Sequence, residues 1–431
     1  MGRGRALGAT LRDLSLKGLS LGLERGCRLA VIVASARVLG DVAFGRFVFA
    51  STVTSLLALG TDLGLGIWTT RALAREPTDG ASVVRVGLTV RSLASLPYAL
   101  AIAAVAAFAV TGESRMAMVL LGVSSLANAF ADHLGAILRG SERFADEARM
   151  NASRAVLTMV IGTVALSFGR SLASLCAGLA AASIGALVYG ASILFRGRRA
   201  GALAGPIALS LARSALRESL PLWFAGLVSL LYFKIDTLFV RAIAGEAELG
   251  AYGAAYKFFE GAMIVPAVLL AVTFPRLARV YRDASSQRWL ERRVTALLLG
   301  LGVLAGAACL FGRDILVVGV FGPGYGRARD SLRVLALGLP LLFVNYGWTH
   351  FLVARDMGRA TLWLASMMLA LTVALDVLFI PRLGGPGAAW ATVLAEVALT
   401  ASCWAALRKR KGAAQTPPKV LGAPRTDRTA A

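Results

Sequence analysis

Long apolar segments alternate with short polar segments over almost the whole chain. Most apolar segments are about 20 residues or longer, the length that an α-helix needs to cross roughly 30 Å of hydrocarbon. We expect membrane-spanning helices at about 16–38, 44–68, 83–110, 116–138, 148–168, 172–195, 216–241, 252–275, 294–311, 331–353, 361–380 and 386–407. The pattern therefore predicts an all-α polytopic membrane protein with about 12 transmembrane helices.

Two short sequences at the ends of apolar segments resemble each other. RVLGDVAFGRF begins at Arg37 and RAIAGEAELGAY at Arg241, and the apolar segments that follow them end near Arg71 and Arg276. The spacing is 204 residues at the first pair and 205 at the last, so one residue is inserted between them. Three matches in one register indicate that the chain consists of two related halves of six helices each.

The duplication predicts how the chain is divided. Because each half has an even number of helices, equivalent helices run in the same direction, and two six-helix parallel-repeat lobes face each other across a central cavity. The repeated turns carry Gly45 and Gly250, which we expect to have a structural role. The expected parts are an N-terminal lobe at 1–195, a cytoplasmic linker at 196–214, a C-terminal lobe at 215–407 and a disordered basic tail at 408–431.

Composition agrees with a membrane protein and adds an orientation. Hydrophobic residues make up 57% of the chain, its mean hydropathy is +0.70 and its net charge is +22. Roughly 29 basic residues lie in the tails and even-numbered loops, against about 10 in the odd-numbered loops. The positive-inside rule therefore predicts that both termini are cytoplasmic. The positive charge then interacts with an anionic membrane leaflet, and we expect no nucleic acid as partner.

Charged residues inside the predicted helices are the candidates for function. A charge at the centre of a membrane helix costs about 2.5–3.5 kcal/mol on insertion scales, so such residues must face water, each other or a ligand. The candidates for substrate binding in the cavity are Arg25, Arg28, Arg91, Lys234, Asp236, Lys257 and Glu260. The first predicted helix also carries Glu24, next to two of these candidates.

Spacing predicts two ion pairs among these residues. Glu24 and Arg28 are four residues apart and Lys257 and Glu260 three apart, so each pair can form on one helix face. Lys234 and Asp236 point to different faces, so each needs a partner on another helix. Ion pairs that only hold helices together are the alternative to a ligand-binding role.

Other polar residues in the spans have simpler expected roles. Asp62 lies in a Gly-rich stretch and is expected to mark a helix end. Neither histidine, His133 or His350, has a neighbour in the sequence that would make it a proton relay. Helix-end or local pairing roles are expected for Asp132, His133, Arg154, Asp376 and Glu396.

Signals of catalysis, metal binding and secretion are missing from the sequence. The loops are short, no nucleotide-binding Gly-rich loop follows a strand, and no Asp-x-Asp motif is present. The cysteines lie inside apolar segments without metal-ligand spacing, at Cys27, Cys176, Cys309 and Cys403. The first apolar segment is charged and lacks a cleavage pattern, so we expect a retained helix. We expect no enzyme, no cofactor and no metal.

Three segments of the chain resemble a known family. Residues 36–75, 218–281 and 384–396 are similar to the polysaccharide and oligosaccharide-lipid flippases of the multidrug/oligosaccharidyl-lipid/polysaccharide exporter (MOP) superfamily. The closest matches to the family pattern are Pro221, Asp236, Gly250, Tyr252, Ala255, Tyr256 and Pro275.

The resemblance implies a fold, a substrate and a location. The fold is twelve helices in two lobes around a V-shaped cavity, which flips an undecaprenyl-pyrophosphate-linked oligosaccharide between leaflets by alternating access for cell-surface polysaccharide synthesis. Cavity arginines meet the pyrophosphate in such relatives, and Arg25 and Arg28 are the nearest candidates here, with Lys234 beside Asp236. The implied location is a bacterial inner membrane. The implied partners are the lipid-linked glycan, membrane lipids and polysaccharide-assembly proteins.

Three other functions stay open at the level of sequence. A multidrug and toxin extrusion antiporter of the same superfamily would favour acidic and aromatic cavity residues for cationic drugs, whereas arginines stand in the first helix. A membrane-embedded glycosyltransferase or polymerase would need a large external loop with carboxylates, but the longest one, at about 312–330, is short and basic. A scaffold with a degenerate cavity is the third.

Overall fold

The structure, a computed structural model, describes residues 2–75, 80–196, 205–206, 208–280, 284–355 and 357–409. All regular elements in these ranges are helices. They are α1 Gly2–Asp62, α2 Leu65–Arg75, α3 Gly80–Phe108, α4 Glu113–Gly140, α5 Phe144–Gly169, α6 Leu172–Phe195, α7 Leu209–Ala244, α8 Glu246–Ala262, α9 Ile264–Val280, α10 Ala284–Asp314, the π-helix η3 Ile315–Phe321, the 3₁₀ helix η4 Pro323–Tyr325, α11 Ala328–Ala354, α12 Gly358–Leu383 and α13 Gly385–Lys409.

The helices account for the twelve predicted crossings. Ten stretches of the described chain are long and apolar enough to cross a membrane. The first of them, Gly22–Arg75, turns at Gly40 and so supplies two crossings. α7 has 36 residues, the length of a crossing, and carries Lys234 and Asp236 within it. The all-α, twelve-helix fold class predicted from the sequence is confirmed.

The duplication is visible in the backbone. Gly40 has φ 76° and ψ 176°, and Gly245, 205 residues later, has φ 90° and ψ −179°. Residues with a side chain rarely adopt this conformation, whereas glycine does so at little cost. Each glycine turns the chain sharply between two helices, α1 before and after Gly40 and α7 into α8 at Gly245. The spacing between the copies is 204 residues at Arg37 and Arg241 but 205 at these two glycines. The one residue inserted in the second copy therefore lies between Arg241 and Gly245.

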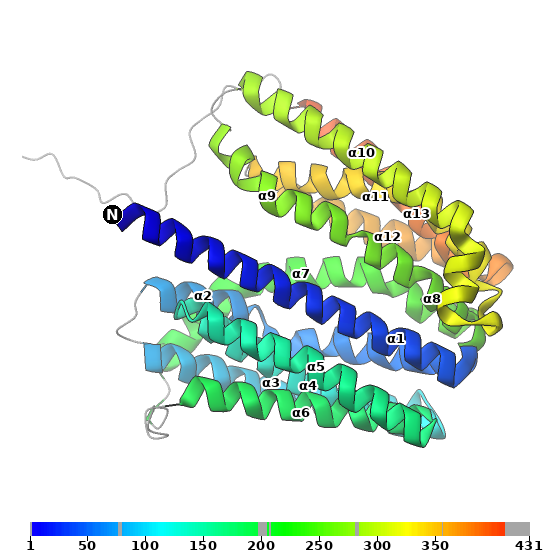
Figure 1. Ribbon diagram of the computed structural model, residues 1–431, viewed down its shortest axis with the longest axis horizontal. Coiled ribbons are helices and arrows are strands. Elements are labelled where there is room, and N and C mark those ends of the chain that lie inside the picture. Colours follow the sequence, from blue (N-terminus) through cyan, green and yellow to red (C-terminus); the bar gives the residue numbers. More distant parts are fainter. Residues whose placement is uncertain are drawn as a thin grey trace, which may run out of the picture.

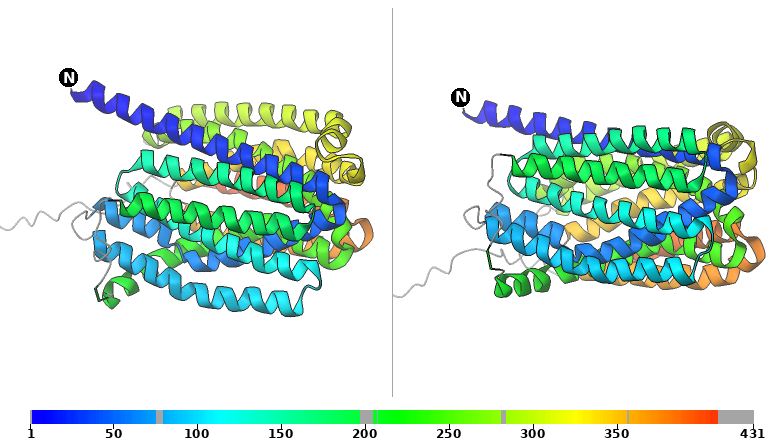
Figure 2. Two further views of the ribbon diagram at one scale, coloured as in Figure 1. Left: turned by 60° about the horizontal axis from the view of Figure 1, so that its bottom comes forward. Right: turned by 90° about the horizontal axis from the view of Figure 1, so that it is seen from below.

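The helices form two bundles that run side by side (Figures 1 and 2). In one bundle, α6 packs on α4 and α5, and α1 packs on α5. In the other, α11 packs on α10 and α13, and α12 packs on α7 and α13. Figure 1 shows α1 crossing diagonally between them. We call the bundle α1–α6 the N-lobe and the bundle α7–α13 the C-lobe.

The predicted boundaries between the parts of the chain stay predictions. α7 begins at Leu209, inside the expected linker at 196–214, and α13 ends at Lys409, just inside the expected tail. Residues 197–204, 207 and 410–431 lie outside the described residues.

Two local expectations need correction. The second predicted helix, 44–68, is interrupted at Leu63 and Gly64, which both have positive φ, and it resumes as α2. At this interruption a Cβ on Gly64 would meet the carbonyl oxygen of Ser219 on α7, so close packing between the lobes replaces the local helix. The segment 312–330, expected as a loop, holds the π-helix and the 3₁₀ helix. Hydrogen bonding within these helices satisfies backbone groups that a loop beside lipid would leave unpaired.

Candidate functional site

Four charged side chains of the N-lobe form one network. Glu24 on α1 accepts hydrogen bonds from Arg28 at 3.2 Å and from Arg154 of α5 at 3.4 Å. Arg154 also pairs with Asp132 of α4. The Arg28 side chain is 71% exposed although it lies within a membrane crossing. Because a charge exposed to lipid is costly, this exposure indicates a water-filled space.

Three charged side chains of the C-lobe form a second network. Glu260 of α8 accepts a hydrogen bond from Lys257 at 2.7 Å, and its other carboxylate oxygen accepts one from Lys234 of α7. Both lysine side chains are 22% exposed and the glutamate is 30% exposed. One carboxylate therefore balances two ammonium groups, which leaves this face of the C-lobe positive.

The two networks approach each other across the space between the lobes. Arg28 of the N-lobe is near enough to repel Lys257 of the C-lobe electrostatically. Arg25, which follows Glu24 on α1, is exposed and makes no ion pair with the described residues. We call this set the inter-lobe charge cluster. Its five cations and three carboxylates are Arg25, Arg28, Arg154, Lys234, Lys257, Glu24, Asp132 and Glu260.

The cluster has the composition of an anion site. Its carboxylates are fewer than its cations, and most of the Arg28 side chain is exposed to solvent. Guanidinium and ammonium groups bind phosphate oxygens through short, charge-assisted hydrogen bonds. The arrangement can therefore hold a phosphate-bearing group at the depth of the bilayer.

Two predicted site residues do not join this cluster. Arg91 of α3 is 1% exposed, and its guanidinium donates to the Asp62 carboxylate and to the carbonyl oxygen of Ala129. Asp236 is 2% exposed and accepts hydrogen bonds from the Tyr252 hydroxyl and the Thr237 amide. In this conformation both residues lie inside their own lobes.

Sequence reasoning assigned only local roles to two members of the cluster. Arg154 and Asp132 were expected to be helix-end or local pairs, and they do pair with each other at 2.5 Å. Arg154 also reaches Glu24 on α1, 130 residues away. Spacing along one helix could not reveal this contact; the only signal was an arginine inside an apolar segment. Asp62 does lie at a helix end, accepting from the Gly66 amide at 3.3 Å, in addition to its pair with Arg91.

The lobes meet tightly at one end of the molecule, around the two repeated turns. A Cβ atom on Gly45 would collide with the carbonyl oxygen of Glu246, and one on Gly250 would collide with that of Asp41. The contact is reciprocal, as an axis relating the two halves requires. Arg46 of the N-lobe pairs with Glu246 of the C-lobe at 2.6 Å. We call residues 40–47 and 245–250 the closed end.

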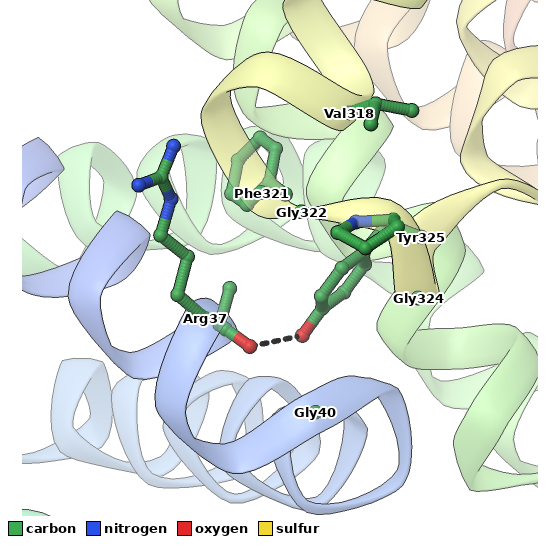
Figure 3. A pocket seen from close by; sticks show the side chains of 9 residues that line it. Arg37, Gly40, Val318, Phe321, Gly322, Gly324 and Tyr325 are labelled. Carbon is green, nitrogen blue, oxygen red and sulfur yellow. Dashed lines mark hydrogen bonds between the residues drawn. The ribbon is translucent and has the colours of Figure 1, made fainter.

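The π-helix region adds a second contact beside the closed end (Figure 3). Arg37 donates from Nε to the carbonyl oxygen of Val320 at 2.7 Å and from Nη2 to that of Gly319. The Tyr325 hydroxyl donates to the carbonyl oxygen of Ala36 at 2.9 Å, next to a pocket of about 500 Å³. Burial raises the pKa of the Tyr325 phenol above its ordinary value, and the Asp41 carboxylate adds to this. The phenol thus stays protonated and keeps donating at physiological pH.

Aromatic packing fills the same contact. Phe44 of the N-lobe lies with its ring centroid 5.9 Å from that of Tyr325 and 6.4 Å from that of Phe321. All three side chains are buried. Aromatic pairs at this distance contribute about 0.5–1.5 kcal/mol each beyond the area they bury. The closed end is therefore sealed by backbone contact, charge pairing and aromatic rings together.

The chain matches one protein-family pattern and is similar to a curated protein. The pattern described as polysaccharide biosynthesis protein matches residues 11–281. A curated relative, the probable flippase AglR of Haloferax volcanii, is 27% identical over 205 residues. This match covers 46% of the chain and 42% of the relative, so the chain spans about two fifths of that protein's length.

Solved structures share the fold at low sequence identity. An inward-facing multidrug resistance MATE family transporter of the MOP superfamily matches with a TM-score of 0.77 and 15% identity, over 90% of this chain and 96% of the other. The lipid II flippase MurJ in an inward closed conformation matches with a TM-score of 0.74 and 14% identity, over 90% and 87%. A MOP superfamily transporter from Pyrococcus furiosus matches with a TM-score of 0.65 and 15% identity, over 92% and 95%.

Proposed function

The chain belongs to the polysaccharide biosynthesis protein family and has the fold of the MOP superfamily transporters, and from this premise we propose that it flips a polyprenyl-pyrophosphate-linked oligosaccharide across the membrane. The observation that carries the proposal is the inter-lobe charge cluster, with its excess of cations and its partly exposed side chains. A diphosphate and a glycan cannot cross about 30 Å of hydrocarbon unaided, and a wet, cationic passage lowers that barrier. Transfer between leaflets breaks no covalent bond, so this function needs no catalytic group.

In this proposal the lipid is transported by alternating access, in which the cavity opens first to one side of the membrane and then to the other. The excess of basic residues in the tails and even-numbered loops supports an orientation with the closed end on the extracytoplasmic side and the termini in the cytoplasm. The described conformation is then the inward-facing state, in which the pyrophosphate reaches Arg25 and Arg28 from the inner leaflet while its prenyl chain stays in lipid. Rocking of the lobes opens the closed end and releases the glycan outside.

The orientation can be tested by labelling single cysteines. Cysteine in place of Thr111, exposed between α3 and α4, is expected to react with a membrane-impermeant maleimide added to intact cells. Cysteine in place of Ser286, exposed at the start of α10, should react only after the cells are opened. The four native cysteines are buried and should give little background. Labelling of the Ser286 position in intact cells would reverse the orientation.

A deletion strain tests the proposed substrate class. We expect cells without this protein to accumulate a lipid-linked oligosaccharide on the inner leaflet and to lose a surface polysaccharide, and we expect the wild-type chain to restore both. Unchanged glycan together with increased sensitivity to cationic drugs would instead support the second candidate.

The second candidate is an antiporter for cationic drugs, favoured by the fold match to the MATE family transporter. A cationic drug would need a cavity with more carboxylates than cations. The inter-lobe charge cluster has the opposite balance, so the flippase proposal stands first.

A further inference from the structure

Two equivalent arginines of the repeat reach across to the opposite lobe. Arg37 begins the first copy, at the end of the first crossing of the N-lobe, and Arg241 begins the second copy, at the end of the first crossing of the C-lobe. They stand three and four residues before the turning glycines Gly40 and Gly245. Each side chain contacts the end of the third crossing of the other lobe.

Arg37 binds the end of η3, which continues α10 and so completes the third crossing of the C-lobe (Figure 3). Its Nε donates to the carbonyl oxygen of Val320 at 2.7 Å, and its Nη2 donates to that of Gly319. Carbonyl groups in the last turn of a helix have no partner within the helix and carry the negative end of its dipole, so they attract a cation. Arg37 therefore caps a helix of the C-lobe from the N-lobe.

Arg241 makes the reciprocal contact with the N-lobe. Its Nη2 donates to the carbonyl oxygen of Ala109, directly after α3, at 3.5 Å, and its Cζ lies 3.9 Å from the ring centroid of Phe49. A guanidinium over an aromatic face is attracted by the ring, which supplements this long hydrogen bond. Glu246 also links Arg241, at 3.7 Å, to Arg46 of the N-lobe, at 2.6 Å. Arg241 therefore holds the end of the third crossing of the N-lobe from the C-lobe.

These contacts can break without leaving a buried charge unpaired. The partners of the two arginines at the helix ends are neutral carbonyl groups, and water can replace each partner when the lobes separate. Arg37 is exposed to solvent in the described state, and the Arg241 side chain is 21% exposed. Separating a fully buried ion pair would be much more costly. The two contacts are therefore suited to form and break in every transport cycle.

A third arginine makes the same kind of contact within one lobe. Arg115 of α4 is exposed and donates to two carbonyl oxygens near the end of α3, that of Ala106 at 2.9 Å and that of Ala107 at 3.4 Å. Because α3 and α4 both belong to the N-lobe, this contact is kept when the lobes separate. Arg115 thus has the charge and the type of partner that Arg37 and Arg241 have, and differs from them in not joining the lobes.

We propose that Arg37 and Arg241 form a paired latch that holds the closed end shut in the inward-facing state. This inference rests on the proposed transport cycle and identifies two positioning residues that set the balance between its two states. In the described state each guanidinium binds carbonyl oxygens of the opposite lobe. When the closed end opens, both contacts break and water replaces the carbonyl groups. Because the contacts are absent from the open state, each arginine shifts the equilibrium toward the closed state.

Labelling of a cysteine between the lobes tests the latch without any transport. Val48 of the N-lobe is buried and packs against Gly253 of the C-lobe, so Val48→Cys reports separation of the lobes. In lipid nanodiscs the purified protein meets the maleimide on both faces, so the result does not depend on orientation. We expect Arg37→Gln and Arg241→Gln each to accelerate labelling about tenfold, and the double variant to be faster than either. Arg115→Gln is the matched control and should leave the labelling rate unchanged.

The control decides the outcome of this experiment. Labelling of either glutamine variant at the rate of Arg115→Gln would overturn the paired latch. Arg37→Lys and Arg241→Lys keep a charged donor but lose the planar fork, so they should label faster than the control and more slowly than the glutamine variants. The lysine variants are compared with the control in the same way if a glutamine variant does not fold.

Flipping is measured separately, with a fluorescent polyprenyl-pyrophosphoryl-N-acetylglucosamine in vesicles. We expect the double glutamine variant to flip this lipid about tenfold more slowly than wild type, because it returns to the inward-facing state less often. Flipping by the double variant at the wild-type rate would overturn the role of the latch in transport. If wild type itself flips no lipid, the proposed function fails, and the labelling rates still decide whether the latch exists.

Discussion

Replacing Arg25 and Arg28 together by alanine is expected to reduce glycan export about 100-fold while the protein still inserts in the membrane. Each arginine that contacts a phosphate oxygen contributes on the order of 1.5–3 kcal/mol, so losing both removes most of the attraction for the pyrophosphate. Insertion should survive because Glu24 keeps its second partner, Arg154, at 3.4 Å. Surface polysaccharide and membrane-inserted protein are measured in the same cells.

Two matched variants control this experiment. The Arg25→Lys and Arg28→Lys double variant keeps the charge but loses the planar, two-pronged donor, and we expect it to retain part of the export. Alanine in place of Arg71 and Arg75, which are exposed on α2 away from the cluster, should change export little. Normal export by the Arg25 and Arg28 alanine variant would exclude both residues as the pyrophosphate site.

A single methyl group at the closed end is expected to have the second largest effect. A Cβ on Gly45 would collide with the Glu246 carbonyl oxygen, so Gly45→Ala destabilises the inward-facing state by about 1–3 kcal/mol and shifts the population toward an open outer end. Export should fall about tenfold because the cycle returns to the inward-facing state less often. Ala36→Cys, buried beside this contact, should become reactive to an impermeant maleimide added outside.

The matching variant lies in the second copy of the repeated turn, and the controls are glycines with open space around them. Gly250→Ala introduces the reciprocal collision with Asp41 and should produce the same two changes. A Cβ on Gly60 or Gly226 would meet nothing within 4 Å, so alanine there should leave export and labelling as in wild type. If Gly45→Ala labels no faster than the Gly60→Ala control, the closed end is not the outer gate.

Features that depend on local periodicity could be predicted from the sequence. Helix length follows from the run of apolar residues, and the pairs Glu24–Arg28 and Lys257–Glu260 follow from positions three or four apart on one helix. The repeated turns could also be recognised, because Gly45 and Gly250 occupy equivalent positions in the two copies of the repeat.

Contacts between distant helices could not be predicted. Lys234 binds Glu260 from another helix, and Arg91 binds Asp62 across 29 positions. A single sequence contains the charges but not the rotation of each helix, and this rotation decides which charges meet. The reciprocal packing of Gly45 and Gly250 was missed for the same reason: the repeat predicts two equivalent turns, and only the packing of the lobes brings them into contact.

The interruption at Leu63 and Gly64 shows a further limit of sequence reasoning. The apolar pattern continues through these residues, so it predicts one unbroken helix, yet both adopt positive φ. Asp62 accepts the Gly66 amide there, and Gly64 packs on α7 of the other lobe. Tertiary contact thus overrides the local helical preference.

Flipping by the purified protein in vesicles tests the central claim most directly. A fluorescent polyprenyl-pyrophosphoryl-N-acetylglucosamine is placed in one leaflet, and its exposure to a membrane-impermeant quencher on the other side is followed over time. The account predicts that wild type exposes the lipid and that the Arg25→Ala and Arg28→Ala double variant exposes it no faster than vesicles without protein. Equal rates for wild type and protein-free vesicles, together with uptake of a cationic dye by wild type, would contradict it.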